Sequence, residues 1–336
     1  MKYFCKMACA GLLLFVLAMG FSGCQTKIEY SNPIVEQRAD PWVIKGDNDM
    51  YYYVATAPEY DRIEIRKSAT INGLTNAEAK VIWTKHTTGV MGHHIWAPEL
   101  HRTNGKWYIY FAAGEAEHVW NIRMYALSND SEDPTTGEWK EEGRIYTDNE
   151  SFSLDATTFE HKGKLYYIWA QHVREGENTS LLISEMETPI KLKGEEVVIC
   201  DPEYDWERTG YNVNEGPAVL KKNGKIFVTY SASATDHNYC VGLLWADEDA
   251  DLMNPDSWNK SEKPVFYTNE AIKRYGPGHN SFTVAEDGKT DVMIYHARDY
   301  KELQGSPLSD PNRHTRARTI KWTEEGFPDF RQNEDD

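Results

Sequence analysis

The hydrophobic residues of this chain fall into short runs that are separated by turns. Five runs rich in Tyr, Trp, Val and Ile, which favour strands, each lead through a tight turn into a second such run. The turns contain pairs such as Asn104-Gly105 and Asn223-Gly224, which supply the positive φ angles that two-residue hairpins need. The pattern therefore predicts five β-hairpins, at residues 40–53, 98–110, 155–169, 215–230 and 279–295.

The spacing of the hairpins predicts how they are assembled. When Asp40, Glu99, Asp155, Glu215 and His279 are aligned as equivalent positions, neighbours lie 56 to 64 residues apart. A period of about 60 residues holds four strands with their loops, which is one blade of a β-propeller. A two-sheet sandwich with an accessory domain is the alternative, but no linker rich in Pro, Gly or Ser marks the boundary it needs. We predict an all-β fold, a single five-bladed β-propeller catalytic domain over residues 25–336.

The N-terminal segment has a different pattern. Lys2 and Lys6 precede an apolar run at residues 7–21, which is shorter than the roughly 20 residues of a membrane-spanning helix and fits a secretory signal. The residues that end at Cys24 resemble the lipobox of bacterial lipoproteins, with Phe21 in place of the usual Leu. We predict that residues 1–24 are a signal peptide and that Cys24 is lipidated. The chain would then be exported and anchored to a bacterial membrane, at the cell surface or in the periplasm; an ordinary cleaved signal is the alternative.

Two cysteines remain besides Cys24 once the signal is removed. Cys200 and Cys240 would be free to pair in an oxidising compartment, but the sequence does not show whether their geometry allows a disulfide. No Cys-x-x-Cys pair is present, so a cysteine-based metal site is disfavoured.

Charge and composition narrow the range of partners. The formal net charge is −17 and the isoelectric point is near 5.1, with no cluster of Lys and Arg, so nucleic acid is disfavoured as a partner. The 20 Tyr and 11 Trp residues suit a protein that binds carbohydrate, because sugars stack their apolar faces on aromatic rings. Strands also favour aromatic residues, so composition alone does not decide between the two explanations. We expect a monomer.

The aligned positions point to catalysis. Asp40, Asp155 and Glu215 are acidic and His279 takes the fifth position, and equivalent positions of a propeller meet at one end of its central channel. Each acid alone could serve a turn, a cap or an ion pair. Together, buried carboxylates repel one another and are costly to desolvate, so the fold gains nothing from them. Carboxyl groups with unequal pKa values are what general acid–base catalysis, including glycoside hydrolysis, needs.

Five motifs, in order and at blade spacing, resemble those of glycoside hydrolase family 43. They are Ala39-Asp40-Pro41, Trp96-Ala97-Pro98-Glu99, Ser153-Leu154-Asp155, Asn214-Glu215-Gly216-Pro217 and Gly278-His279-Asn280-Ser281. The resemblance implies an inverting hydrolase in which Asp40 is the general base, Asp155 the pKa modulator and Glu215 the general acid. Residues 90–99, 152–159 and 275–282 look closest to the exo-acting α-1,5-L-arabinofuranosidase branch. That branch implies release of terminal α-L-arabinofuranosyl residues from plant-type arabinan or arabino-oligosaccharides.

Further residues are candidates for substrate binding. Trp42, His94 and Trp96 adjoin the aligned positions, although each Trp could equally be a packed core aromatic. The family places an Arg in its last blade, and Arg298 and Arg316 are the two candidates, with a surface position as the alternative for each.

His279 is predicted to line the sugar site and has two interpretations in relation to metal. It could hold a structural calcium ion on the propeller axis through water, as in several family members, or it could be a hydrogen-bonded axial His. Calcium prefers oxygen ligands, which makes a direct His ligand atypical. We expect that no cofactor is required for hydrolysis.

Two other functions stay open at this point. The chain could be a β-xylosidase or another furanosidase of the same family, because the loops that shape the pocket decide the sugar. It could also be a non-catalytic glycan-binding surface lipoprotein, for which the acids would be dispensable. A propeller scaffold for protein partners would not gather acids at all.

Overall fold

The computed structural model describes Met1, residues 28–176 and residues 178–335. Nearly all regular structure in this part of the chain is β-strand, and its helical segments are short 3-10 turns, which confirms the predicted all-β fold. None of its helices is long and apolar enough to cross a membrane. The predicted signal peptide and Cys24 fall at residues 2–27, outside the described residues.

The elements follow one another with short connections. In order they are β1 (Ala39–Lys45), β2 (Tyr51–Thr56), β3 (Arg62–Ser68), η1 (Asn72–Asn76), β4 (Lys80–Thr84), β5 (His93–Thr103), β6 (Lys106–Gly114), β7 (Arg123–Asn129), β8 (Lys140–Arg144), β9 (Ser153–His161), β10 (Lys164–Gln171), β11 (Ser180–Thr188), β12 (Lys191–Leu192), β13 (Val197–Cys200), η2 (Asp205–Glu207), β14 (Asn214–Lys222), β15 (Lys225–Ala232), β16 (Cys240–Asp247), η3 (Pro255–Ser257), β17 (Asn259–Lys260), η4 (Glu270–Ile272), β18 (Tyr275–Val284), β19 (Asp291–Arg298), β20 (His314–Thr319), β21 (Lys321–Trp322) and β22 (Pro328–Asp329).

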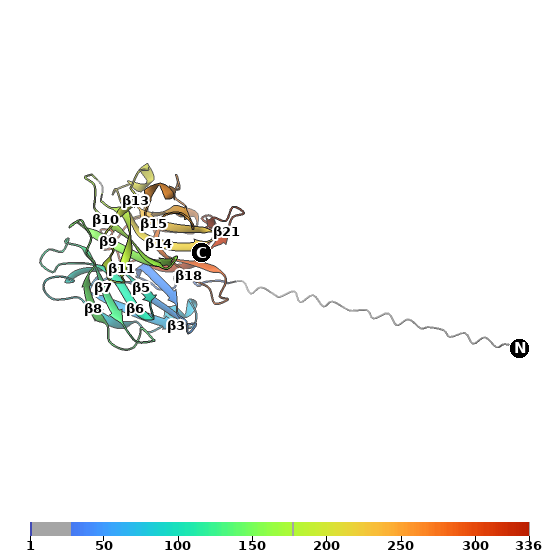
Figure 1. Ribbon diagram of the computed structural model, residues 1–336, viewed down its shortest axis with the longest axis horizontal. Coiled ribbons are helices and arrows are strands. Elements are labelled where there is room, and N and C mark those ends of the chain that lie inside the picture. The colour runs from blue at the N-terminus through green and yellow to red at the C-terminus, as the bar shows by residue number, and fades with distance from the viewer. Residues whose placement is uncertain (2–27, 177, 336) are drawn as a thin grey trace.

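Five antiparallel sheets form the blades of a propeller (Figure 1). The first, second and fourth blades have the strand orders β1-β2-β3-β4, β5-β6-β7-β8 and β14-β15-β16-β17. The third blade has the order β9-β10-β11-β12, with β13 also paired to β11, and the fifth has β18-β19-β20. The first strands of neighbouring blades contact one another in turn, and β18 contacts β1, which closes the ring. The five-bladed prediction is confirmed.

The N-terminal chain reinforces this closure. Val35 forms an antiparallel bridge with Thr315 of β20, so residues before β1 extend the fifth blade. The amide of Ile34 donates to the carbonyl of Thr315 at 2.8 Å, and the amide of Thr315 donates to the carbonyl of Val35 at 2.8 Å. This pairing covers an edge strand that would otherwise present unpaired backbone groups.

All five predicted hairpins form, but their turns differ in length. Asn104 and Gly105 adopt φ angles of 52° and 80°, and β5 and β6 are joined by these two residues alone. The same two-residue connection joins β9 to β10 and β14 to β15. The two-residue prediction is wrong for the fifth blade, where residues 285–290 connect β18 to β19. There the Asp287 side chain accepts hydrogen bonds from the amides of Lys289 and Thr290, which stabilises a longer turn.

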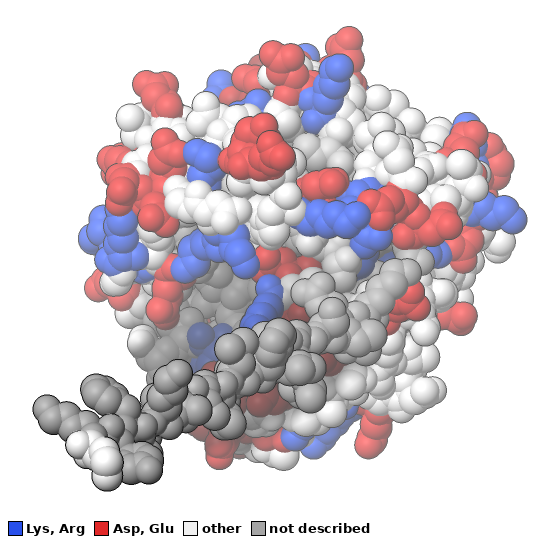
Figure 2. Space-filling model, turned by 90° about the vertical axis from the view of Figure 1, so that its right-hand side faces the viewer, with Lys and Arg blue, Asp and Glu red and all other residues white. Residues whose placement is uncertain are grey.

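Apolar side chains between adjacent blades form the core. One cluster joins the second, third and fourth blades and includes Trp169 and Ile168, while smaller clusters join the remaining pairs. Cys200 and Cys240 are buried and both are free thiols, so they do not form a disulfide. On the face in Figure 2, acidic and basic side chains are interspersed, in keeping with the expectation that nucleic acid is not a partner.

Candidate active site

The first strand of every blade carries a β-bulge near its start. This is the end of the strand at which the predicted catalytic residues meet, and we call it the channel end. The pairing register shifts beside Asp40, Ala97, Asp155, Gly216 and His279, and these five residues have φ angles between 43° and 56°. They are the structurally equivalent positions of the repeat. The sequence alignment was therefore out of register in two blades, because Glu99 lies two residues after Ala97 and Glu215 lies one residue before Gly216.

These bulges aim side chains into the channel at a conformational cost. A left-handed backbone costs a residue with a side chain about 1–2 kcal/mol. Bulges and such strained residues gather beside active sites, where they direct a side chain that a regular strand would point elsewhere. Asp40, Asp155 and His279 have left-handed backbones and buried side chains, so this local geometry supports the functional interpretation of all three residues.

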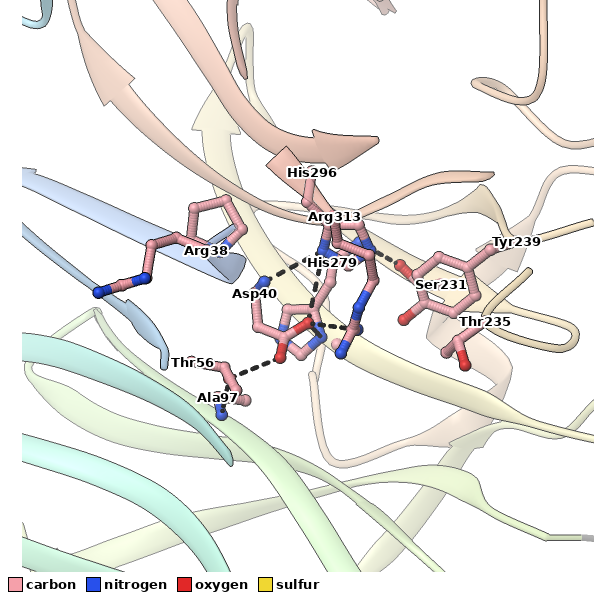
Figure 3. Close-up of polar contacts among 12 residues, drawn as sticks. Arg38, Asp40, Thr56, Ala97, Ser231, Thr235, Tyr239, His279, His296 and Arg313 are labelled. Atoms are coloured by element: carbon pink, nitrogen blue, oxygen red, sulfur yellow. Dashed lines mark hydrogen bonds and ion pairs between the residues drawn. The ribbon is translucent and has the colours of Figure 1, made fainter. Parts of the chain in front are cut away.

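Asp40 is held by polar groups of the first and fifth blades, and the second blade supports one of them (Figure 3). The Thr56 hydroxyl donates to its Oδ2 at 2.6 Å, and the amide of Ala97 donates to that same hydroxyl at 2.7 Å. The Arg313 guanidinium donates to Oδ1 at 3.3 Å. Burial opposes ionisation of Asp40, but the charge of Arg313 and the hydrogen bond from Thr56 hold its pKa below the usual range. Asp40 is therefore an ionised carboxylate at neutral pH.

Two histidines complete the surroundings of Asp40. The amide of Asp40 donates to Nδ1 of His296 at 3.0 Å, which assigns the proton of that ring to Nε2. The Nδ1 of His279 lies 3.4 Å from Oδ1 of Asp40 and 3.7 Å from Oδ2 of Asp155, so His279 bridges the two acids. Burial lowers the pKa of both His279 and His296, which keeps the rings neutral.

Gly216 allows His279 to take its place between the acids. A Cβ at position 216 would lie 3.0 Å from Cγ of His279, and the φ angle of 56° further favours glycine. The amide of His279 donates to the Ser231 hydroxyl at 2.7 Å, which fixes the backbone next to the bulge. The Gly in the Glu-Gly-Pro motif is thus explained by close packing on the His ring.

Glu215 and Asp155 have pKa values shifted in the opposite direction to that of Asp40. Burial, followed by the charge of Asp40, raises the pKa of Glu215 to about 7. A hydrogen bond of 2.7 Å from the Tyr239 hydroxyl to Oε1 acts in the opposite direction and lowers this pKa. Burial, followed by the charges of Glu215 and Asp40, raises the pKa of Asp155. A hydrogen bond of 3.1 Å from the amide of Gly216 lowers it in part. The two groups titrate as a pair, which retains a proton near neutral pH. The site therefore holds an ionised carboxylate beside two carboxyl groups that share one proton, the combination that acid–base catalysis uses.

His94 and Trp96 form an aromatic cluster at the start of β5. Their ring centroids lie 4.4 Å apart, and Trp120 lies 4.8 Å from His94 and 6.1 Å from Trp96. The Nδ1 of His94 and the Nε1 of Trp96 are buried and have no hydrogen-bond partner among the described residues. Buried polar atoms are normally satisfied, so these two atoms are available to sugar hydroxyls. This supports the predicted roles of His94 and Trp96 in substrate binding.

Trp42, in contrast, has the contacts of a packing residue. Its indole donates to the carbonyl of Leu100 at 2.8 Å, and its ring lies 4.6 Å from that of His101 in the next blade. These contacts match the alternative interpretation, a packed aromatic between the first two blades.

The arginine beside the carboxylates is Arg313, which the sequence analysis did not select. Arg298 donates to the carbonyls of Thr235 and Pro307 at 2.9 and 3.3 Å, and so ties loops together. Arg316 is paired with Asp299. The selection of Arg298 and Arg316 is therefore corrected: only Arg313, of the three, contacts Asp40.

Topology explains why Arg313 was missed and how it could have been found. The first strand of a blade starts at the channel end, so its third strand also starts there. Arg313 directly precedes β20, the third strand of its blade, whereas Arg316 lies within β20 opposite Tyr295. Tyr239 precedes β16, the third strand of its blade, in the same way. Thr56 and His296 lie in second strands, just after the last residues of the repeated segments, so the motif did not include them.

The structure offers limited support for a metal on the axis. Within the described residues, no group of three or more His, Cys, Asp or Glu side chains could hold a metal ion directly. Glu99 is buried with a pKa raised mainly by burial, and its Oε2 lies 2.9 Å from Nε2 of His101. A protonated carboxyl is a poor calcium ligand. Calcium held through water near His279 therefore stays a prediction.

Comparison with known proteins identifies relatives across the whole propeller. The sequence model described as glycosyl hydrolases family 43 matches residues 30–328. An extracellular exo-α-(1→5)-L-arabinofuranosidase of Streptomyces avermitilis is 53% identical over 304 residues, which cover 90% of this chain and 63% of that protein. A protein of the same name from Streptomyces chartreusis is 57% identical over 279 residues, 83% of this chain and 85% of the relative. The chain thus spans less than two thirds of the first relative and most of the second.

A solved structure agrees with these relatives. The α-L-arabinofuranosidase of Lactobacillus brevis superposes with a TM-score of 0.87 at 50% sequence identity. The similarity covers 90% of this chain and 96% of that structure. The resemblance inferred from the five motifs, and its closest branch, are confirmed.

Proposed function

The chain belongs to glycoside hydrolase family 43, and on that premise we propose that it is an inverting, exo-acting α-L-arabinofuranosidase. Its substrate would be α-1,5-linked arabinan or arabino-oligosaccharides, from which it would release terminal arabinofuranosyl residues. The observation that carries the proposal is the opposed ionisation of Asp40 and the Asp155–Glu215 pair at one end of the propeller channel. The names of relatives more than 50% identical to this chain support the choice of sugar.

In the proposed mechanism Asp40 is the general base. Its carboxylate is fixed by Thr56 and Arg313 and stays ionised, so it can remove a proton from a water on one face of the sugar. Glu215 is the general acid, which donates its proton to the glycosidic oxygen on the opposite face. Asp155 shares the buried site, and its negative charge would keep the pKa of Glu215 high. A single displacement by water inverts the anomeric centre.

Product analysis on linear α-1,5-arabino-oligosaccharides tests this function. We expect arabinose to be released one unit at a time, with no release from xylo-oligosaccharides tested alongside. Release of xylose would favour a β-xylosidase with the same propeller and acids. Tight binding without release from any furanoside or xyloside would favour the glycan-binding alternative.

We also propose that the chain is exported and lipid-anchored through Cys24, and that it acts as a monomer. The extracellular relatives support export, and the lipobox-like sequence supports the anchor. A stable anchor would need more than one acyl chain, because each buried CH₂ contributes only about 0.8 kcal/mol. Incorporation of labelled palmitate by the wild-type chain, and its loss in Cys24→Ser, would support the anchor; labelling that persists in Cys24→Ser would contradict it.

We further propose that hydrolysis needs no metal ion, because the carboxyl groups described above account for both proton transfers. Dialysis against EDTA should leave the rate unchanged. Loss of activity that calcium restores would instead support a structural ion near His279.

A further inference from the structure

A second hollow lies along the outer strands of the second blade, β7 and β8, and the connections at their ends. It is a cavity of about 330 Å³ that none of the catalytic carboxylates lines. A neighbouring cavity of about 380 Å³, lined by residues 149–151 and 172–176, shares Glu150 with it. Both volumes fall within the roughly 300–1,000 Å³ typical of ligand pockets.

The first cavity opens on the same end of the propeller as the catalytic site. Its walls come from the connections that lead into β5 and β9 and from the connection between β6 and β7, all of which lie at the channel ends of their blades. Asn121 lines the cavity, and the preceding residue, Trp120, is 58% exposed. Because the Trp120 ring contacts His94 and Trp96, this exposed ring adjoins both the cavity and the aromatic cluster at the start of β5.

The lining groups are suited to a neutral ligand with many hydroxyls. Arg123 and Arg144 face Glu115 and Glu150, so the charges balance, and Glu150 lies 2.8 Å from Nη2 of Arg144. The Nε of Arg123 lies 3.8 Å from Oε2 of Glu150, whereas the Nε of Arg144 is buried and has no hydrogen-bond partner among the described residues. Tyr146, which also lines the cavity, is 70% exposed and lies against the Arg144 guanidinium. Balanced charges and an unsatisfied donor beside an exposed ring match the hydroxyls and the apolar face of a sugar.

The wall shared by the two cavities is fixed in place. Gln171 is fully buried and its amide nitrogen donates to Thr147, Asn149 and Ser151 at 3.1, 2.7 and 2.9 Å. These bonds fix the segment that carries Glu150. A preformed site loses less conformational freedom on binding, which favours affinity.

We propose that the cavity beside β7 and β8 of the second blade is a distal subsite for a neutral pentose polymer. It holds units of the same chain whose terminal sugar occupies the site at Asp40 and Glu215. The inference rests on the proposed arabinan substrate and adds to it a second point of contact. Long substrates gain from this contact, and substrates of one or two sugars do not.

Tyr146→Ala and Arg144→Gln test the subsite, with Tyr211→Ala as the matched control. Tyr211 is also an exposed tyrosine, 54% accessible, in the connection that leads into β14, but it lines neither cavity. We expect KM for linear arabinan to rise about three- to tenfold in the two variants, with kcat/KM for an aryl arabinofuranoside within twofold of wild type. Parallel losses on both substrates, or no change on arabinan, would overturn the proposal, as would an equal effect of Tyr211→Ala.

Binding without catalysis separates this inference from the proposed function. In the background of Glu215→Gln, linear arabinan in a native gel should retard the protein, and Tyr146→Ala should reduce the retardation. If the wild-type chain hydrolyses no arabinofuranoside, the proposed function fails, whereas retardation still tests the subsite. Stronger retardation by an acidic glycan than by arabinan would contradict a neutral ligand.

Discussion

The two ends of each inner strand use the same backbone conformation for different purposes. At the hairpin end the left-handed residues include Asn104, Gly105 and Lys162, which are exposed. At the channel end they include Asp40 and Asp155, which are buried. Both ends of a strand thus depart from regular geometry, but only one of them also buries charge.

The difference separates folding from function. Gly and Asn adopt the left-handed conformation at little cost, so the residues at the hairpin end suit the turn itself. At the channel end Asp tolerates the left-handed conformation about as well as Asn does, so the cost that sets Asp40 and Asp155 apart is the desolvation of a buried carboxyl group. Gly216 is the exception that fits the same logic, because its neighbour Glu215 supplies the carboxyl group and His279 leaves no room for a Cβ. The acidic and histidine side chains at the channel end are therefore explained by their chemistry and not by the stability of the fold.

Glu215→Gln should have the largest effect. The amide can still accept the hydrogen bond from Tyr239, but it has no proton to give, so kcat on arabino-oligosaccharides should fall by about 10³–10⁴. An aryl arabinofuranoside with a good leaving group needs little acid assistance and should lose less than about tenfold. Steady-state kinetics on both substrates measure the difference. Equal losses on the two substrates would remove Glu215 from the acid role.

Arg313→Gln and Arg316→Gln form a matched pair in and beside the same strand. Without Arg313 the buried Asp40 carboxylate loses its cation, so kcat should fall about 100-fold and stability by about 3–5 kcal/mol. Arg316 forms an ion pair with the exposed Asp299, and loss of that pair should cost about 0–1 kcal/mol and leave kcat within twofold. Urea unfolding and kinetics distinguish the two. Similar results for both variants would contradict the placement of Arg313.

The pH profile tests the opposed ionisation at the channel end. Activity requires protonated Glu215, whose pKa is about 7, so kcat/KM should fall as the pH rises through 7. Asp40 has a pKa below its usual range, so the acid limb should lie below about pH 4.

Asp155→Asn removes a negative charge beside Glu215 and should lower the pKa of that residue. The alkaline limb should then move down by about one pH unit. Asp249→Asn, an exposed change at the hairpin end of the fourth blade, should leave the limb in place. A shift of the alkaline limb to higher pH in Asp155→Asn would refute its role as the pKa modulator.

Lys162→Asn changes a turn residue at the hairpin end and should have the smallest effect on stability and activity. Lys162 has a φ angle of 49° where two other blades carry Asn, which tolerates that conformation better. The change also removes an exposed ion pair with Asp249, so stability should change by less than about 1 kcal/mol, without any effect on kcat. Thermal unfolding and a standard assay are sufficient. A loss of activity would show that the two ends are not independent.

The fold could be predicted because its signals are local. Turn residues such as Asn104-Gly105 act within a few residues, and the blade period repeats them, so the hairpins and their number were evident in the sequence. The longer connection at residues 285–290 was missed because Asp287-Gly288 has the composition of a two-residue turn.

The sequence could predict only those site residues that belong to the repeated motif. Asp40, Asp155 and Glu215 belong to the repeated motif, whereas Tyr239, His296 and Arg313 approach them from other strands or loops after the ring closes. The misplaced equivalence of Glu99 has a similar cause. A bulge shifts the pairing register of the strand through its backbone conformation. The bulge residues of the five blades differ in type, so the sequence does not show where the shift occurs.

The anomeric configuration of the first product tests the central claim most directly. Proton NMR recorded during hydrolysis of α-1,5-arabinotriose shows which anomer of arabinose forms before mutarotation. Catalysis by Asp40 as base and Glu215 as acid predicts that β-arabinofuranose appears first and that the α anomer follows by equilibration. Initial release of the α anomer would contradict the account, because it requires a carboxylate nucleophile and a covalent intermediate in place of an activated water.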